Sequence, residues 1–362
     1  MKYLLVITQF ISVSVFAQNS QRDELNPNQL EIKEFKLDAQ KIAPDYLKLP
    51  FKSIKIIDSR FDTSKIGYIL ATNIFSDKKS SFKQMVLQGG NGNAIEKYYN
   101  KYYAGSFTGN DFELLIVIKR FWLGADSKRN NKRVEVTNSV ESNNTIYCKW
   151  EYYLGKNGKY LPVKRVDTVI QNSIELSKYI QEEFSEKKLS FFKYALRGLI
   201  EILDYSNAIK QFDSVPKKTW IAVNEFNQKM NLMPALLGNT FKKGVYLSFD
   251  DFRKNRPSII DFQEKKMHYG KMNANTEIYL EDMTGTIISN YWGYSDGTVF
   301  RYGMLGNDKI YRIQNTFCFF IKVLGYVISS DTQAGSGMVT TSKNKYEIWV
   351  PFQIDMETGE IY

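Results

Sequence analysis

The chain has 362 residues, of which 43% are hydrophobic, 15% aromatic and 24% charged, and its formal net charge is +10. This composition excludes an intrinsically disordered chain, and the length exceeds what one hydrophobic core usually serves, so two domains are predicted. The chain contains one histidine, which excludes a metal site built from several histidines.

The first seventeen residues have the pattern of a secretory signal peptide. Lys2 supplies a positive charge, an apolar run extends from Tyr3 to Phe16, and Ala17 precedes the polar Gln18. The run is too short to span a bilayer, which needs about 20 apolar residues. We therefore expect cleavage between Ala17 and Gln18 and export to the periplasm, the cell surface or the exterior. The polar residues 18–29 should form a flexible segment.

Residues 30–205 are predicted to form an α+β domain in which a sheet packs against helices. Gly155-Lys156-Asn157-Gly158 separates two apolar segments and predicts a hairpin turn. Alternating apolar residues predict strands, and helical spacing predicts helices. The expected strands are 30–37, 54–57, 66–71, 112–123, 145–154 and 160–170, and the expected helices are 94–103 and 173–205.

Two short clusters in this domain, Asp58-Ser59-Arg60 and Ile66-Gly67, precede a helix and a long strand. In this order residues 45–205 resemble the periplasmic α/β lipoproteins and transport-auxiliary components of bacterial envelopes. The resemblance implies a place in the cell envelope and supplies no catalytic residue. Many such proteins carry a lipid-attachment cysteine after the leader, and this chain has none there.

Residues 206–218, which include Pro216, are predicted to form a linker. Residues 219–362 are predicted to form a second domain, a mainly antiparallel β meander. Ser248 and Asp251 have the spacing of a capping box at the start of a short helix. The segment 331–344, rich in Gly, Ser and Thr, is expected to be a mobile loop. A helix is expected at 221–230, and strands at 244–249, 277–280, 286–289, 298–302, 310–314, 316–327 and 346–354.

The second domain carries a further recognisable pattern, which consists of Gly244-Val245-Tyr246, Asp251-Phe252, Asn255-Arg256-Pro257-Ser258 and Trp292-Gly293-Tyr294-Ser295-Asp296-Gly297. In these residues the region 240–330 resembles uncharacterised secreted proteins of the Bacteroidota. The resemblance implies no known activity. It indicates aromatic anchors in the meander and a glycine turn after Asp296.

The best candidate for a binding surface is the group Tyr291, Trp292, Tyr294 and Asp296. Aromatic rings beside polar residues can stack on a sugar or anchor a partner protein. The same residues can instead form a strand core and a turn, and the position of Trp292 between a strand and a glycine turn favours this structural interpretation.

Other residue types suggest no catalytic, metal or cofactor site. Cys148 and Cys318 lie in apolar contexts and are expected to be buried thiols, with a disulfide between them in an oxidising compartment as the alternative. His268 lies among lysines with no nucleophile elbow in the chain. The basic run 128–133 lacks interleaved aromatic residues, which argues against nucleic-acid binding. Acidic pairs occur at Asp250-Asp251, Glu182-Glu183 and Glu281-Asp282, where caps, a solvated helix face and a turn explain them.

The sequence thus predicts an exported binding or interaction protein of the cell envelope or exterior, with an envelope protein or a glycan as partner. It predicts no cofactor, no nucleic-acid partner and no transmembrane helix in the mature chain. One alternative is a carbohydrate hydrolase that uses two carboxylates. A second alternative is an accessory subunit of an envelope complex.

Overall fold

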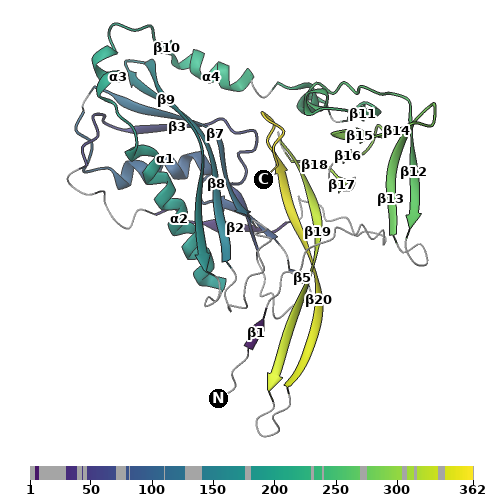
Figure 1. The fold of residues 1–362 in the computed structure, drawn as a ribbon. Helices are drawn as coiled ribbons and strands as arrows, with labels where there is room; N and C mark the ends of the chain where they lie inside the picture. Colours follow the sequence, from purple (N-terminus) through teal and green to yellow (C-terminus); the bar gives the residue numbers. More distant parts are fainter. Residues whose placement is uncertain are drawn as a thin grey trace. The chain divides into compact units, whose positions relative to one another are not determined.

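The computed structural model describes residues 5–7, 30–38, 43, 47–70, 79–80, 82–109, 111–126, 141–175, 181–229, 232–238, 240–269, 275–303, 308–313, 316–332 and 339–361. The chain divides into two compact units that interleave in sequence. The first, here called the helical unit, comprises Glu31–Ala71 and Lys83–Lys229. The second, here called the β unit, comprises Met1–Leu30, Thr72–Phe82 and Met230–Tyr362. Helices and strands occur in both (Figure 1), so the predicted α+β class is confirmed.

The helical unit is built on one eight-stranded mixed sheet. Its strands follow the spatial order β10 (Lys218–Thr219), β9 (Lys159–Glu175), β8 (Glu141–Lys156), β7 (Glu113–Asp126), β4 (Gly67–Leu70), β6 (Phe82–Leu87) and β2 (Ile32–Phe35), and β3 (Ile54–Asp58) also pairs with β7.

Three long antiparallel strands, β7 to β9, form the centre of this sheet. The predicted hairpin between β8 and β9 is confirmed. Its two turn residues, Asn157 and Gly158, both have positive φ, 51° and 70°. Two-residue turns of this kind match the twist of antiparallel strands, which explains the Asn-Gly pair.

Helices α1 (Asn91–Tyr102) and α2 (Gln181–Glu201) pack on one face of the sheet (Figure 1). The core between them is rich in aromatic side chains. Tyr99 donates a hydrogen bond to the Leu196 carbonyl (2.7 Å), and Tyr152 donates one to the Leu199 carbonyl (2.9 Å). These bonds satisfy phenol groups that would otherwise be buried without partners.

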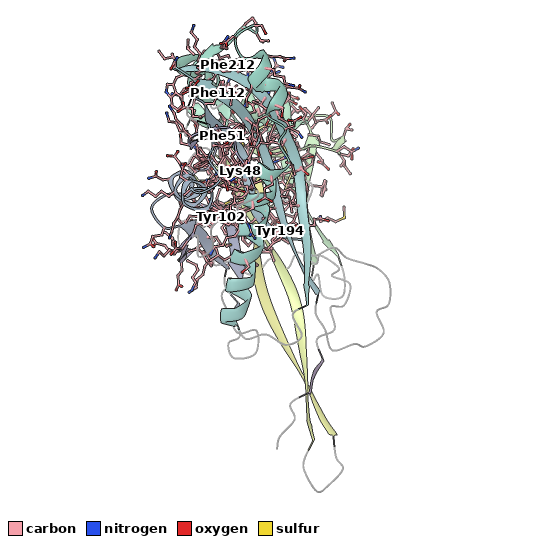
Figure 2. The ribbon with its side chains drawn as sticks, turned by 90° about the vertical axis from the view of Figure 1, so that its left-hand side faces the viewer. Lys48, Phe51, Tyr102, Phe112, Tyr194 and Phe212 are labelled. Carbon is pink, nitrogen blue, oxygen red and sulfur yellow. The ribbon has the colours of Figure 1, made fainter. Side chains whose placement is uncertain are left out.

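The structure differs from the sequence-based expectation at 173–218. Strand β9 continues to Glu175, so the helix begins later than expected. The expected linker contains α3 (Ser206–Gln211) and β10, and it belongs to the helical unit, which ends only after α4 (Trp220–Lys229). Phe212 explains this, because its side chain is buried and its ring lies 5.1 Å from Phe112 (Figure 2).

The free edge of β3 is covered by side chains of α1. Asn100 accepts a hydrogen bond from the Ile54 amide (3.0 Å) and donates one to the Ile54 carbonyl (2.7 Å). Glu96 accepts a hydrogen bond from the Ile56 amide (2.8 Å). An unpaired strand edge invites pairing with other chains, and α1 here occupies that edge.

The β unit contains three separate sheets. In the largest, the hairpin of β19 (Thr316–Thr332) and β20 (Val339–Ile354) pairs with β18 (Tyr311–Ile313), β1 (Leu5–Ile7) and β5 (Lys79–Ser80). The second has the order β11 (Gly244–Tyr246), β15 (Gly293–Ser295), β16 (Phe300–Tyr302) and β17 (Asp308–Lys309). The third has the order β12 (Phe262–Tyr269), β13 (Asn275–Asp282) and β14 (Ile287–Ile288). Two short helices complete the unit, α5 (Pro234–Leu237) and α6 (Phe249–Arg253).

Two expectations for the strands of this unit were wrong. Of the segment 331–344, expected to be a mobile loop, residues 331–332 end β19 and residues 339–344 begin β20, which pair down to Thr332 and Val339, while residues 333–338 lie outside the described residues. Cross-strand pairing thus overrides a loop-like composition. Strand β12 was missed because its lysines and glutamates hide the period-two pattern, although its whole length pairs with β13.

Most of the predicted leader lies outside the described residues, including Ala17 and Gln18, as does the segment 18–29. The exception is β1, in which Leu5 pairs with Ser330 and Ile7 with Ile328. Among the helices that the structure describes, none is long and apolar enough to cross a membrane.

We expect Asn100→Ala to destabilise the helical unit, because it leaves the Ile54 amide and carbonyl without partners. Each buried backbone group left unpaired costs about 1–3 kcal/mol. Urea unfolding followed by circular dichroism measures the loss. Asn93→Ala, at an exposed position of the same helix, is the matched control and should leave stability nearly unchanged. Equal stability of the two variants would contradict the edge-covering role of Asn100.

Candidate functional site

The first cluster of interest is the loop between β3 and β4, which contains the Asp58-Ser59-Arg60 motif. Both strands run parallel to β7 along the same edge. From Asp58 to Gly67 the chain advances nine residues, whereas β7 advances five from Ile118 to Leu123. The additional residues leave the sheet as a loop, and this interrupts the hydrogen-bond ladder beside Phe121.

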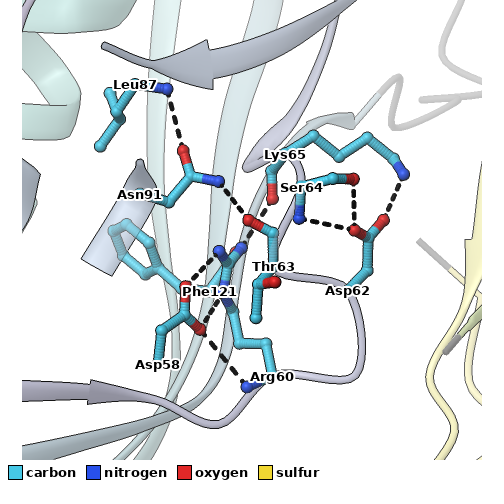
Figure 3. Close-up of polar contacts among 9 residues, drawn as sticks. All are labelled: Asp58, Arg60, Asp62, Thr63, Ser64, Lys65, Leu87, Asn91 and Phe121. Atoms are coloured by element: carbon cyan, nitrogen blue, oxygen red, sulfur yellow. Dashed lines mark hydrogen bonds and ion pairs between the residues drawn. The ribbon is translucent and has the colours of Figure 1, made fainter. Parts of the chain in front are cut away.

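Arg60 fills the interruption (Figure 3). Its guanidinium binds both oxygens of Asp58, at 2.8 Å to Oδ1 and 2.7 Å to Oδ2. Its Nη1 donates to the carbonyls of Lys65 (2.7 Å) and Phe121 (3.2 Å). The side chain is only 6% exposed. The planar guanidinium thus supplies a donor to β7 where the neighbouring strand is missing, while a bidentate carboxylate balances its charge.

Two further side chains close the loop (Figure 3). Asn91, at the start of α1, accepts a hydrogen bond from the Leu87 amide (2.9 Å) and donates one to the Thr63 carbonyl (2.7 Å). Asp62 accepts a hydrogen bond from the Ser64 amide (2.9 Å) and forms an ion pair with Lys65. The polar groups of the cluster are therefore directed at one another. This arrangement orders the loop.

The second cluster is the pattern of residues 244–303 in the β unit, and its polar members are also used internally. The predicted capping box is confirmed: Ser248 accepts a hydrogen bond from the Asp251 amide, and Asp251 accepts one from the Ser248 amide, both at 3.1 Å. Ser258 donates a third bond to Asp251 (2.9 Å). Asn255 accepts hydrogen bonds from the Tyr246 hydroxyl (2.8 Å) and the Lys242 amide (2.9 Å).

Two glycines of this pattern, Gly244 and Gly293, are required by close approach. A Cβ atom on Gly244 would lie 2.4 Å from a carbon of Pro257. One on Gly293 would lie 2.4 Å from the ring of Phe300 and 2.6 Å from the Arg301 carbonyl. Such contacts are too short for carbon atoms, so the pattern encodes packing of backbone against neighbouring chain.

The candidate binding residues lie in the same region, and the burial of two of them agrees with the structural interpretation that the sequence favoured over a binding surface. Trp292 is 8% exposed and Tyr294 is 1% exposed. The Trp292 ring lies 4.3 Å from the ring of Phe252, 5.3 Å from Tyr302 and 5.5 Å from Phe249. Tyr294 packs with Val245 and Leu280. The two rings are parts of a core and are not displayed for a ligand.

The other two predicted binding residues frame this core. Tyr291 is half-buried, with its ring 6.0 Å from that of Tyr294. Asp296 is exposed, and its Oδ1 accepts hydrogen bonds from the amides of Thr298 and Val299, both at 2.7 Å. Partial burial opposes ionisation of Asp296, but these bonds outweigh it and lower its pKa. Asp296 is therefore a turn residue.

The acidic pairs also have structural partners. Asp250 is exposed, and its hydrogen bond with Lys254 lowers its pKa. A hydrogen bond from Thr284 and another from the Thr286 amide lower the pKa of Asp282. Glu281 on β13 forms an ion pair with Lys265 on the neighbouring strand β12, with 3.9 Å between Oε2 and Nζ. The side chains of Glu182, Glu183 and His268 lie outside the described residues.

Cys148 and Cys318 are both buried and form no disulfide, as expected from their sequence contexts. Burial raises the pKa of the Cys148 thiol, which keeps it protonated and unreactive. Within the described part of the chain, no three His, Cys, Asp or Glu side chains gather as metal ligands would.

No protein-family model matches the chain, and no curated protein matches it. Among solved structures, a Xanthomonas campestris protein of the family DUF330 has 11% identity and a TM-score of 0.31, over 50% of this chain and 99% of its own. An uncharacterized protein has 8% identity and a TM-score of 0.23, over 47% of this chain and 96% of its own. At TM-scores this low, neither similarity supports a conclusion about fold or function.

We expect Arg60→Leu to destabilise the helical unit by about 3–5 kcal/mol, because it leaves the Asp58 carboxylate without its partner. It also leaves the Phe121 carbonyl without its donor from Arg60. Denaturant unfolding of the two proteins measures the difference. Arg256→Leu, at an exposed arginine, is the matched control. A midpoint unchanged from the natural protein would show that the loop does not depend on Arg60.

We expect Trp292→Ala to destabilise the β unit by about 3–5 kcal/mol, the usual cost of removing a large buried ring. Thermal unfolding monitored by near-ultraviolet circular dichroism reports this loss. Trp220→Ala, at a tryptophan that is 40% exposed, should cost much less. If Trp292→Ala kept its full stability, the ring would not be the core anchor that its contacts indicate.

Proposed function

We propose that the protein is an exported interaction protein of the bacterial cell envelope or exterior, and that it acts by binding. The leader pattern of residues 1–17 supports export. The closed hydrogen-bond networks around Arg60 and Asp251 support a structural purpose for the two sequence motifs. Binding is then expected to use exposed residues outside these two motifs.

One surface observation carries the proposal: two neighbouring large apolar residues of the helical unit are both exposed. Trp220 is 40% exposed and Ile221 is 64% exposed, at the start of α4. Apolar side chains exposed singly are normal in soluble proteins. Adjacent ones, with a further apolar residue, Val215, 37% exposed nearby in the chain, are typical of an interaction site.

A carbohydrate hydrolase is less well supported. Its general acid needs a carboxyl group whose pKa is raised, so that it is protonated at neutral pH. Among the described residues, every carboxyl group with a clearly shifted pKa has it lowered; these are Asp38, Glu113, Glu151, Asp204, Asp250, Asp282 and Asp296. They favour the ionised form, which suits ion pairs and turns.

We expect the mature protein to begin at Gln18 and to be found outside the cytoplasm. Expression in a bacterial host, followed by fractionation and mass spectrometry of the intact protein, tests this. Ala17→Leu is the matched control, because a bulky residue at the cleavage site should cause the uncut precursor to accumulate. Natural protein that retains Met1 in the cytoplasmic fraction would contradict export. Stable co-purification with an envelope complex would identify the protein as an accessory subunit.

A further inference from the structure

We propose that the exposed group Val215, Trp220 and Ile221, together with Lys210, Lys217 and Lys218, binds the surface of an anionic lipid membrane. This group is called the Trp220 patch below. The inference rests on the proposed function, because an exported protein of the cell envelope encounters lipid surfaces.

The apolar part of the patch is held in a fixed orientation. Helix α4 is anchored by Val223, which is 1% exposed and packs with Leu115, Val117, Tyr153 and Tyr160 on the sheet. The Trp220 ring lies 5.8 Å from the Tyr160 ring, and Thr219 Oγ1 accepts a hydrogen bond from the Ala222 amide (3.2 Å). With one side of α4 packed, the side chain of Ile221 remains exposed.

The charged part of the patch lies close by in the chain. Lys210 and Lys218 are exposed, and Asp213 is the one acidic residue between them. Lys217 Nζ donates a hydrogen bond to the Val215 carbonyl (3.0 Å) and lies 5.1 Å from the centre of the Phe212 ring. This contact places an ammonium group beside an apolar residue of the patch.

This combination has the chemistry of a membrane surface. Tryptophan prefers the boundary between water and the acyl chains, since its ring is apolar and its N–H is polar. Aliphatic side chains such as Ile221 enter the acyl region, while lysines remain at the level of the lipid phosphates. The excess of lysines over acids makes the patch complementary to anionic lipids. A neutral glycan would gain no charge attraction from these lysines.

The expected binding is weak and dependent on salt. Each lysine near an anionic bilayer increases the affinity about fivefold, and dissolved salt reduces this contribution by screening the charges. Burial of Ile221 contributes about tenfold or more. A patch of this size therefore supports reversible attachment.

The test uses the full chain and vesicles of phosphatidylcholine with phosphatidylglycerol, and vesicles of phosphatidylcholine alone as the neutral reference. Lipids brominated on their acyl chains quench the fluorescence of a tryptophan that enters the bilayer. Trp122, Trp150 and Trp292 are buried, and the side chain of the fifth tryptophan, Trp349, lies outside the described residues. The quenching that is lost in Trp220→Phe is therefore the share that belongs to Trp220. The apolar leader can also carry the chain to a vesicle, and the Trp220→Phe variant, which keeps the leader, is the control for that route.

We expect quenching of Trp220 by anionic vesicles, with little by neutral ones. Ile221→Ser should weaken binding about tenfold or more, and Lys218→Gln about fivefold. Ile202→Ser, at a residue of the same unit that is 55% exposed, is the matched control and should bind as the natural protein does.

Equal binding by Ile221→Ser and the natural protein, or the absence of Trp220 quenching, would overturn the proposal. So would a dependence on Trp220 that requires a membrane protein in the vesicles, because the partner would then be that protein. The outcome of the vesicle test can be distinguished from the outcome of the export experiment. Binding by a chain that stays in the cytoplasm with Met1 would contradict export and support the patch, whereas an exported chain without binding would contradict the patch.

Discussion

The Arg60 guanidinium connects parts of the helical unit that the strand ladder alone joins weakly. Among the described residues, the pairing of β4 with β7 joins Gly67 to Leu123, and the outer strands β6 and β2 attach through β4. That junction is tight, because a Cβ atom on Gly67 would lie 2.2 Å from the Leu123 carbonyl oxygen. Arg60 reinforces it by binding Asp58, the Lys65 carbonyl and Phe121 of β7. Continuity of the eight-stranded sheet therefore depends on a side chain at the place where its backbone pairing is interrupted.

In the β unit, packed aromatic rings stabilise strands that backbone pairing alone joins weakly. In the sheet that carries Trp292, strands β11, β15 and β16 have three residues each, too few to hold a fold by backbone pairing. Trp292, Phe252 and Phe300 supply the missing burial, with ring centres 4.3–5.8 Å apart. The residues that make this region recognisable in sequence are thus its structural supports. The resemblance to secreted proteins of the Bacteroidota, which is a sequence-based prediction, would then reflect a shared way of packing.

The proposed interaction site follows from this division of roles. Residues that form the motifs are used inside the fold, whereas Trp220 and Ile221 belong to no recognisable motif and remain exposed. Helix α4 presents them from a packed base at Val223, so binding would not require the patch to become ordered first. A surface of this kind needs only a few apolar side chains and lysines, which is why it leaves so little trace in a sequence pattern.

The sequence alone determined features set by local geometry and short-range chemistry. Asn157-Gly158 specified its hairpin because both residues tolerate positive φ, and Ser248 with Asp251 specified a helix start because their spacing satisfies free amides. Tertiary structure decided what depends on neighbours distant in sequence. Phe212 joins a core, so residues 206–218 belong to the helical unit instead of forming a linker. Trp292 is buried, and Arg60 faces β7. Burial of a ring and the partner of a guanidinium are fixed by elements far along the chain, and period and composition carry no record of those contacts.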